Sequence, residues 1–316
     1  MGRQITEEQL EAELKPQVTW RQRVLSLLKY SVALAVLYFV LQQADLEQVL
    51  AYAKTIPVWI VLVAFMAFNM AQLFGALRMR YYYRAIGREL QRPFTFALYY
   101  VGLFYNLILP GGIGGDAYRV FTLKQRAGFP VMEGVRLQLA NRANGLAVLL
   151  FIMLSALFFI DFGNHTFLAN IMTLFMILFA FLGYLVCAKL FLRENERTAI
   201  GALKYSFAIQ GFTVLVIVAL WYALGDGDHL AEYVFLFMLS MILGMVPITV
   251  GGLGIREFTF FYGSHYINQI TGSELKPELG VTIALLFFAV TALTSASGIL
   301  ALPWLKRLSP CMADEK

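Results

Sequence analysis

Residues 106–119 read NLILPGGIGGDAYR and decide how this chain is interpreted. One proline and four glycines, all of which disrupt helices, end an apolar run and are followed at once by Asp116 and Arg119. A second break of this kind occurs at residues 245–257, MVPITVGGLGIRE, where Arg256 and Glu257 supply the charges. Two such breaks in one hydrophobic chain are its most informative feature.

The composition is that of a membrane protein. Of the 316 residues, 59% are hydrophobic and 14% are charged, whereas soluble domains carry about 25% charged residues. Apolar runs long enough to cross a bilayer recur along the chain, which predicts an all-α polytopic membrane protein. The net charge of +5 is explained by basic loops, so no nucleic-acid partner is expected. Neither Cys187 nor Cys311 has His or acidic neighbours in metal-ligand spacing, so no metal or other cofactor is expected.

Hydropathy predicts six full spans and two shorter apolar runs. The full spans cover residues 24–41, 58–77, 135–160, 167–188, 205–224 and 281–302. The shorter runs cover residues 94–109 and 233–246, and each ends in one of the two breaks.

The positions of the basic residues select the topology. If both short runs crossed the membrane, the Arg-rich loops at residues 78–92 and 119–126 would face opposite sides. If each run and the helix after its break form a re-entrant hairpin, every basic loop and both termini lie on the cytoplasmic side. We therefore predict six full transmembrane helices plus two re-entrant helical hairpins, at about residues 94–118 and 233–262, in the inner (cytoplasmic) membrane.

The same pattern divides the chain into two halves of like order. Residues 1–163 and 164–316 each contain three spans and one hairpin, and the Gly-Gly-x-Gly of 111–114 matches that of 251–254. Three crossings in each half require opposite orientations, so the halves are predicted to be inverted repeats. Interrupted hydrophobic segments at matching positions of inverted halves indicate a transporter's substrate site. We expect the two breaks to meet near the middle of the membrane.

The residues at the breaks suit a phosphate group. Backbone without helical hydrogen bonds must be buried in protein or line a wet cavity, and the helix that each break begins favours an anion at its N-terminus. Arg119 and Arg256 stand beside the breaks, and guanidinium binds phosphate bidentately. Arg142, about two turns into a span, and Asn106, within an apolar run, could line the same cavity. The predicted substrate-binding residues are Asn106, Gly111, Gly112, Gly114, Gly115, Asp116, Arg119, Arg142, Gly251, Gly252, Gly254, Arg256 and Glu257.

Each of these functional assignments has a structural alternative. The glycines could allow close helix packing, Asp116 could be an N-cap, and Glu257 could neutralise Arg256. Alternatively, both carboxylates pair with the arginines when no substrate is bound, or carry a coupling proton. Arg119 could lie in the basic loop at the interface, and Arg142 could be a helix–helix hydrogen-bond anchor. The arginines at positions 78 and 80 are assigned to the positive-inside pattern.

Residues 106–119, the pair Asn141-Arg142 and residues 246–257 together resemble the transmembrane family of lysylphosphatidylglycerol synthase/flippase proteins. That family includes the flippase region of the multiple-peptide-resistance factor and stand-alone membrane proteins. The resemblance covers nearly the whole chain and implies an inner-membrane protein that moves, or helps to synthesise, a phosphate-bearing lipid. In the family an acid often precedes the arginine at the position of Arg142, and Asn141 departs from that pattern. The family's lysyl transferase region is a separate soluble domain, so no such activity is expected here.

Lipid transport is the leading interpretation. An anionic glycerolipid or polyprenyl-phosphate-type lipid would move between leaflets as the halves rock, and the glycine-rich runs lack the Lys-Ser/Thr of an ATP-binding P-loop. One alternative is a membrane enzyme with Asp116 or Glu257 as acid or base, although no nucleophile–base pair and no intramembrane His accompanies them, so no catalytic residue is predicted. The other is an accessory subunit in lipid or glycolipid synthesis. A second copy of the chain, or a lipid-synthesis enzyme, is the protein partner considered.

Overall fold

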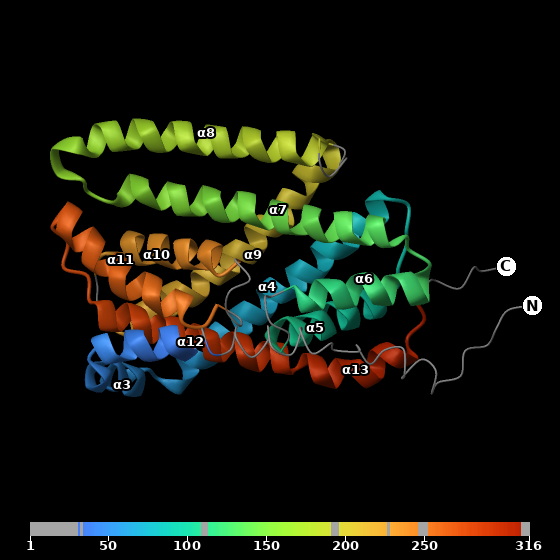
Figure 1. Ribbon diagram of the computed structural model, residues 1–316, viewed down its shortest axis with the longest axis horizontal. Helices are drawn as coiled ribbons and strands as arrows, with labels where there is room; N and C mark the ends of the chain where they lie inside the picture. The colour runs from blue at the N-terminus through green and yellow to red at the C-terminus, as the bar shows by residue number, and fades with distance from the viewer. Residues whose placement is uncertain are drawn as a thin grey trace, which may run out of the picture.

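The computed structural model describes residues 31, 34–108, 113–190, 196–225, 228–245 and 252–310. Within these ranges the chain is built from helices and contains no β-strand (Figure 1). In chain order the elements are α3 (Leu46–Thr55), α4 (Val58–Ala85), α5 (Arg92–Ile108), α6 (Gly114–Ala127), α7 (Val131–Ala156), η1 (Leu157–Phe159), η2 (Gly163–His165), α8 (Thr166–Leu190), α9 (Glu196–Ala223), α10 (Leu230–Leu243), α11 (Ile255–Thr271), α12 (Pro277–Ala296) and α13 (Gly298–Arg307).

Five segments are long and apolar enough to cross a membrane. They are Val58–Ala85, Val131–Phe159, Gly163–Lys189, Arg197–Ala223 and Pro277–Arg307. Each contains or closely matches one of the predicted full spans, which confirms an all-helical, multi-pass membrane protein. Half of the remaining predicted span, 24–41, lies outside the described residues; residues 34–41 of it belong to the short apolar helix Leu34–Gln43.

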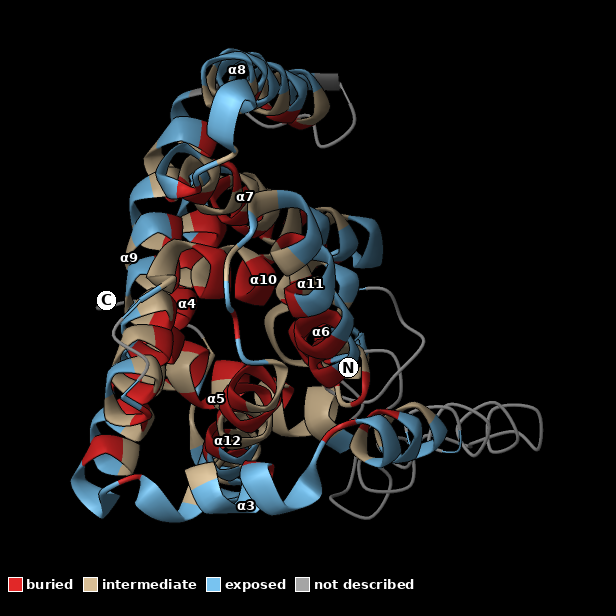
Figure 2. Ribbon diagram, turned by 90° about the vertical axis from the view of Figure 1, so that its left-hand side faces the viewer, coloured by how far each residue is buried: buried red, intermediate tan, exposed pale blue. Residues whose placement is uncertain are grey.

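Helix α8 shows how the lipid-facing surface is made. It is the most apolar of the five spans, with a mean hydropathy of 2.5 over its best window, yet little of that window is buried. Its large side chains, such as Phe167, Phe175 and Phe179, are mostly exposed, and the helix packs mainly against α7 and α9. In Figure 2 it stands at the edge of the bundle and is mostly coloured as exposed. A helix that is apolar all round and uncovered by protein is suited to contact with lipid.

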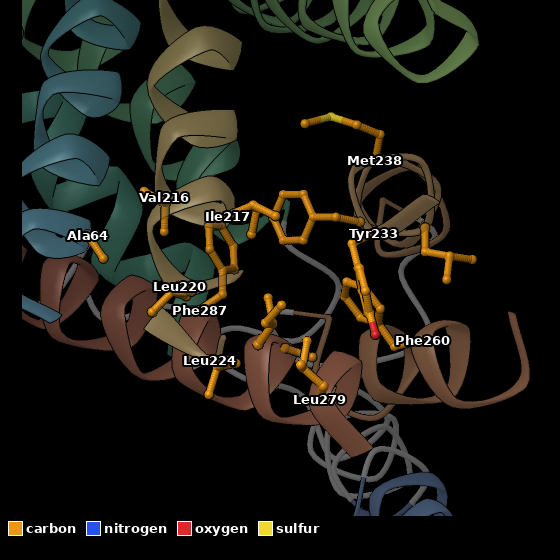
Figure 3. Packing of buried hydrophobic residues seen from close by; sticks show 14 of the residues in the cluster. Ala64, Val216, Ile217, Leu220, Leu224, Tyr233, Met238, Phe260, Leu279 and Phe287 are labelled. Atoms are coloured by element: carbon orange, nitrogen blue, oxygen red, sulfur yellow. The ribbon is translucent and has the colours of Figure 1, made fainter. Parts of the chain in front are cut away.

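The main core lies between the second break and the middle of the bundle. Buried side chains from α4, α9, α10, α11 and α12 pack together there, as Figure 3 shows. Phe287 of α12 meets Phe237 of α10 edge to face, with ring centroids 4.8 Å apart. Because this cluster fixes α10 and α12 against one another, it also fixes the start of α11, which packs on both.

Two helix pairs occupy the places of the predicted hairpins. Helix α5 packs on α6, and α10 packs on α11. Figure 1 shows the two pairs toward opposite ends of the long axis. The connecting segments 109–112 and 246–251 lie outside the described residues. Re-entrant entry, six complete crossings, and the division into inverted halves at residues 163 and 164 therefore remain predictions.

Candidate functional site

Asp116 joins two arginines at the start of α6. Its Oδ1 accepts a hydrogen bond from Arg119 Nη1 at 2.9 Å, and its Oδ2 accepts one from Arg142 Nε at 2.6 Å. Arg119 lies one turn farther along α6, while Arg142 comes from α7. Two guanidinium groups and one carboxylate leave this cluster with a net charge of +1. The predicted pairing of the first acid with arginines is confirmed.

Arg119 is held in a slot made by α5. Only 4% of the residue is exposed, its Nη2 donates to the carbonyl of Tyr99 at 3.0 Å, and its guanidinium carbon lies 4.5 Å from the centre of the Tyr99 ring. A Cβ at Gly102 would come within 2.7 Å of Arg119 Cζ, so glycine is required for this approach. The alternative that Arg119 lies in an interfacial loop is therefore wrong, because tertiary hydrogen bonds hold it inside the protein.

Asn106 connects the end of α5 to the first turn of α6. Its Oδ1 accepts a hydrogen bond from the backbone N–H of Gly115 at 2.8 Å, which satisfies one of the free amides of the helix start. A Cβ at Gly115 would overlap the carbonyl group of Gly102, so the two helices touch through their backbones here. Gly114 is the first residue of α6, and Ile113 is its N-cap. The N-cap interpretation of Asp116 is therefore wrong by three residues.

The second break places Arg256 and Glu257 in the core, but does not pair them. The guanidinium carbon of Arg256 lies 4.8 Å from the centre of the Phe287 ring, and its Nη2 contacts Met241 Sδ at 3.6 Å. Arg256 is only 5% exposed, and neither its Nε nor its Nη1 has a hydrogen-bond partner within the described residues. Adjacent helical residues point in different directions, and no salt bridge joins Arg256 to Glu257 in the described part of the chain. Direct neutralisation of Arg256 by Glu257 is thus not observed.

Glu257 instead caps α11, of which it is the third residue. Its Oε2 accepts a hydrogen bond from the backbone N–H of Gly254 at 2.6 Å, and the residue is fully buried. Gly252 and Gly254 have φ angles of 79° and 85°, a left-handed conformation that residues with a side chain rarely adopt. The second break therefore requires glycine for backbone reasons. Gly111, Gly112 and Gly251 lie outside the described residues, and the meeting of the two breaks stays a prediction.

A buried arginine on α4 was missed by the sequence analysis. Arg78 is 7% exposed; its Nε donates to Asn141 Oδ1 at 2.8 Å and its Nη1 to Ser206 Oγ at 2.5 Å. Ser206 in turn donates to Asn144, whose amide donates to the Tyr184 hydroxyl at 2.5 Å. The assignment of Arg78 to a basic loop is wrong, because α4 continues to Ala85. The sequence held one indication of the partners of Arg78, because Asn141 and Asn144 are polar residues within a predicted span.

A groove runs between α6 and α7 and ends at the Asp116–Arg142 ion pair. Its volume is about 450 Å³. Apart from the charged end and one glutamine, its walls are apolar; it is lined by Ile113, Asp116, Ala117, Val120, Phe121, Val131, Val135, Gln138, Leu139 and Arg142. The cluster thus has a cavity beside it in which a partly apolar ligand could lie.

Comparison with protein families now identifies the class of molecule. Residues 26–203, more than half of the chain, match the family described as lysylphosphatidylglycerol synthase TM region. The chain belongs to this family. Membership associates it with membrane lipids, and the resemblance seen in the sequence is confirmed over residues 26–203, which do not include the second break. Among curated proteins, none matches the chain.

The family match covers the residues around Asp116 but not the charged residues of the second break. Asp116, Arg119, Arg142 and the groove beside them all fall within residues 26–203, whereas Arg256 and Glu257 lie beyond that range. The geometry around Asp116 is therefore part of the lysylphosphatidylglycerol synthase TM region itself. The family does not by itself separate lipid movement from lipid synthesis.

Proposed function

We propose that this chain moves a phosphate-bearing lipid, of the anionic glycerolipid or polyprenyl-phosphate type, between the leaflets of the cytoplasmic membrane. The phosphate binds between the two breaks, where it contacts Arg256 and the Arg119–Arg142 cluster. The hydrocarbon tails stay in the bilayer while the two halves of the protein rock around the site. Both termini and the basic loops face the cytoplasm, and the pairs α5–α6 and α10–α11 are re-entrant hairpins.

The observation that carries this proposal is the state of Arg256. A guanidinium buried in a membrane protein is costly and marks functional sites. Two of the three nitrogens of Arg256 have no hydrogen-bond partner within the described residues, and no carboxylate there pairs with it. A phosphate oxygen would satisfy these donors and supply the missing charge. The position of Arg256 in the first turn of α11, at the positive end of the helix dipole, favours the same ligand.

The first cluster supports the same class of ligand. Asp116 compensates only one of its two arginines, and about one third of the Arg142 side chain is exposed. A phosphate can therefore approach Arg142 without displacing the more deeply held Arg119. The sequence holds no ATP-binding loop, so the drive is an ion gradient or the lipid's own concentration difference.

Reconstitution in liposomes tests the proposal. Purified protein is placed in vesicles that contain phosphatidylglycerol with a fluorescent acyl chain, and a membrane-impermeant quencher reports how much of the probe reaches the outer leaflet. The wild type should expose nearly all of the probe, while Arg256→Ala should slow exposure about tenfold or more, because a charge-assisted hydrogen bond contributes about 1.5–3 kcal/mol.

Arg84→Ala is the matched control. Arg84 lies on α4 with about half of its side chain exposed and pairs with Glu89, so its removal should leave the rate unchanged. Recovery of a chemically altered lipid would support the enzyme interpretation instead. Unaltered lipid that stays in its original leaflet would overturn transport and favour an accessory role in lipid synthesis.

A further inference from the structure

We propose that the groove between α6 and α7 binds one hydrocarbon chain of the transported lipid, with the lipid's phosphate at the Asp116–Arg142 end. This inference rests on the proposed function and adds the place where the tail is held. The apolar walls of the groove have no role in the phosphate binding proposed above.

The lining residues form one continuous stripe on each helix. At the N-cap of α6 and along that helix they are residues 113, 116, 117, 120 and 121, and on α7 they are residues 131, 135, 138, 139 and 142. Both series follow the three- and four-residue spacing that places side chains on a single helix face. The groove therefore runs along the helices for about 12 Å on α6 and about 16 Å on α7, at 1.5 Å per residue.

The groove has a charged end and an apolar end. The chain turns back between α6 and α7 at residues 128–130, so the two helices run in opposite directions and Asp116 faces Arg142 at the end away from the turn. Near the turn the walls are Phe121 and Val131, both more than 40% exposed. An amphipathic ligand fits this arrangement because its polar group and its hydrocarbon chain meet matching surfaces.

The charge at the Asp116–Arg142 end selects an anionic lipid. Two arginines share one aspartate there, and Arg142 is the cation that a ligand in the groove can reach, since its side chain is 34% exposed while that of Arg119 is 4% exposed. A cavity of about 450 Å³ is also far larger than the roughly 30 Å³ that one water occupies. The groove is therefore assigned to a lipid with an anionic head and a hydrocarbon chain, rather than to a bound water molecule.

The groove would hold a lipid inverted relative to the lipids of the cytoplasmic leaflet. With the basic turn on the cytoplasmic side, as the charge distribution predicts, the charged end lies deeper in the membrane than the apolar end. A lipid in the groove would have its phosphate nearer the membrane centre than its tail. A resting lipid of the cytoplasmic leaflet has the opposite orientation.

Photocrosslinking tests this inference. The purified full chain in detergent is irradiated with phosphatidylglycerol that carries a diazirine in the middle of one acyl chain, and the labelled peptides are mapped by mass spectrometry. Adducts should concentrate in residues 113–121 and 131–142. Adducts spread evenly over exposed surfaces, α8 included, would overturn the inference.

Variants that fill the groove supply the control. Ala117→Trp should reduce labelling of these two segments about tenfold, whereas Leu182→Trp, on the exposed face of α8, should leave it unchanged. Ala117→Cys modified with a bulky maleimide after purification gives the same test on protein that has already folded. Unchanged labelling after this modification would overturn the inference.

Three further comparisons identify the ligand and separate this inference from the proposed function. Arg142→Gln should weaken labelling by phosphatidylglycerol more than labelling by an uncharged diacylglycerol probe. An excess of glycerol phosphate, which has no chain, should not compete; full competition would show that the site binds phosphate alone. If the wild type transports lipid but the groove is not labelled, the groove inference is overturned and the proposed function stands. If the groove is labelled but no lipid is transported, the proposed function is overturned and the groove remains a lipid-binding site.

Discussion

Asp116 Oδ2 lies 2.6 Å from Arg142 Nε, and this ion pair lies at one end of the groove between α6 and α7. The same carboxylate holds Arg119 through its other oxygen. A single acid therefore positions one arginine from its own helix and one from the next. Its removal changes both the charge and the packing of the cluster.

The substitution Asp116→Asn should destabilise the protein by about 2–4 kcal/mol, because it removes the carboxylate that pairs with the buried Arg119 and with Arg142. Thermal unfolding in detergent measures this change. The control is Glu89→Gln, which breaks an exposed pair and should change stability by less than about 1 kcal/mol. In the double variant Asp116→Asn/Arg142→Gln the losses should not add, and additive losses would contradict direct coupling of the pair.

Substitution of Gly115 by alanine should be severe. The new Cβ would overlap the carbonyl group of Gly102 and force α5 away from α6, which also stretches the hydrogen bond from Gly115 to Asn106. We expect the free energy of unfolding to fall by about 1–3 kcal/mol or more, which is the cost of forcing extra atoms into a well-packed core. Gly183→Ala on α8 is the control: nothing lies within 4 Å of its added Cβ, and alanine should stabilise this helix by about 0.5–1 kcal/mol.

Removal of the Arg78 guanidinium should loosen the joint between α4, α7 and α9. Arg78→Met leaves Asn141 Oδ1 and Ser206 Oγ without their donor, and an unsatisfied buried polar group costs about 1–3 kcal/mol. Ser206→Ala should cost less, because the guanidinium keeps Asn141. Unfolding measurements that rank the two variants in the reverse order would contradict this account of the network.

Two substitutions of Glu257 separate capping from proton coupling. Glu257→Ala removes the acceptor for the Gly254 N–H and should lower stability by about 1 kcal/mol, whereas Glu257→Gln keeps an acceptor oxygen and should stay closer to the wild type. If the residue only caps α11, Glu257→Gln should also transport lipid at the wild-type rate. Loss of transport in a stable Glu257→Gln protein would show that the carboxylate itself is needed.

The spans could be predicted because the membrane imposes a length and a polarity on every helix that crosses it. The chemistry around the breaks was predictable only where the partners lie on one face of the same helix. Asp116 and Arg119 are three residues apart on one helix face and do pair, whereas Arg256 and Glu257 are adjacent, point apart and do not. The partner of Asp116 on α7 depends on how α6 and α7 pack, which no local pattern specifies.

Arg78 was mispredicted for a related reason. A charge beyond a 20-residue apolar run indicates the membrane interface when only hydropathy is considered. The helix continues past that point, and three polar side chains from two other helices surround the guanidinium. Partners more than 60 residues away in sequence leave no trace in the hydropathy profile.

The isolated position of α8 has a consequence for how the protein is assembled. A span this apolar enters the bilayer as a stable helix before it has any protein neighbour. It then docks on α7 and α9 through a seam that includes Ala188 and Ala199, where Tyr184 donates a hydrogen bond to the Ala199 carbonyl at 3.2 Å. Because Tyr184→Phe removes this hydrogen bond at the seam, we expect it to slow the maturation of newly made chains more than it disturbs the finished protein.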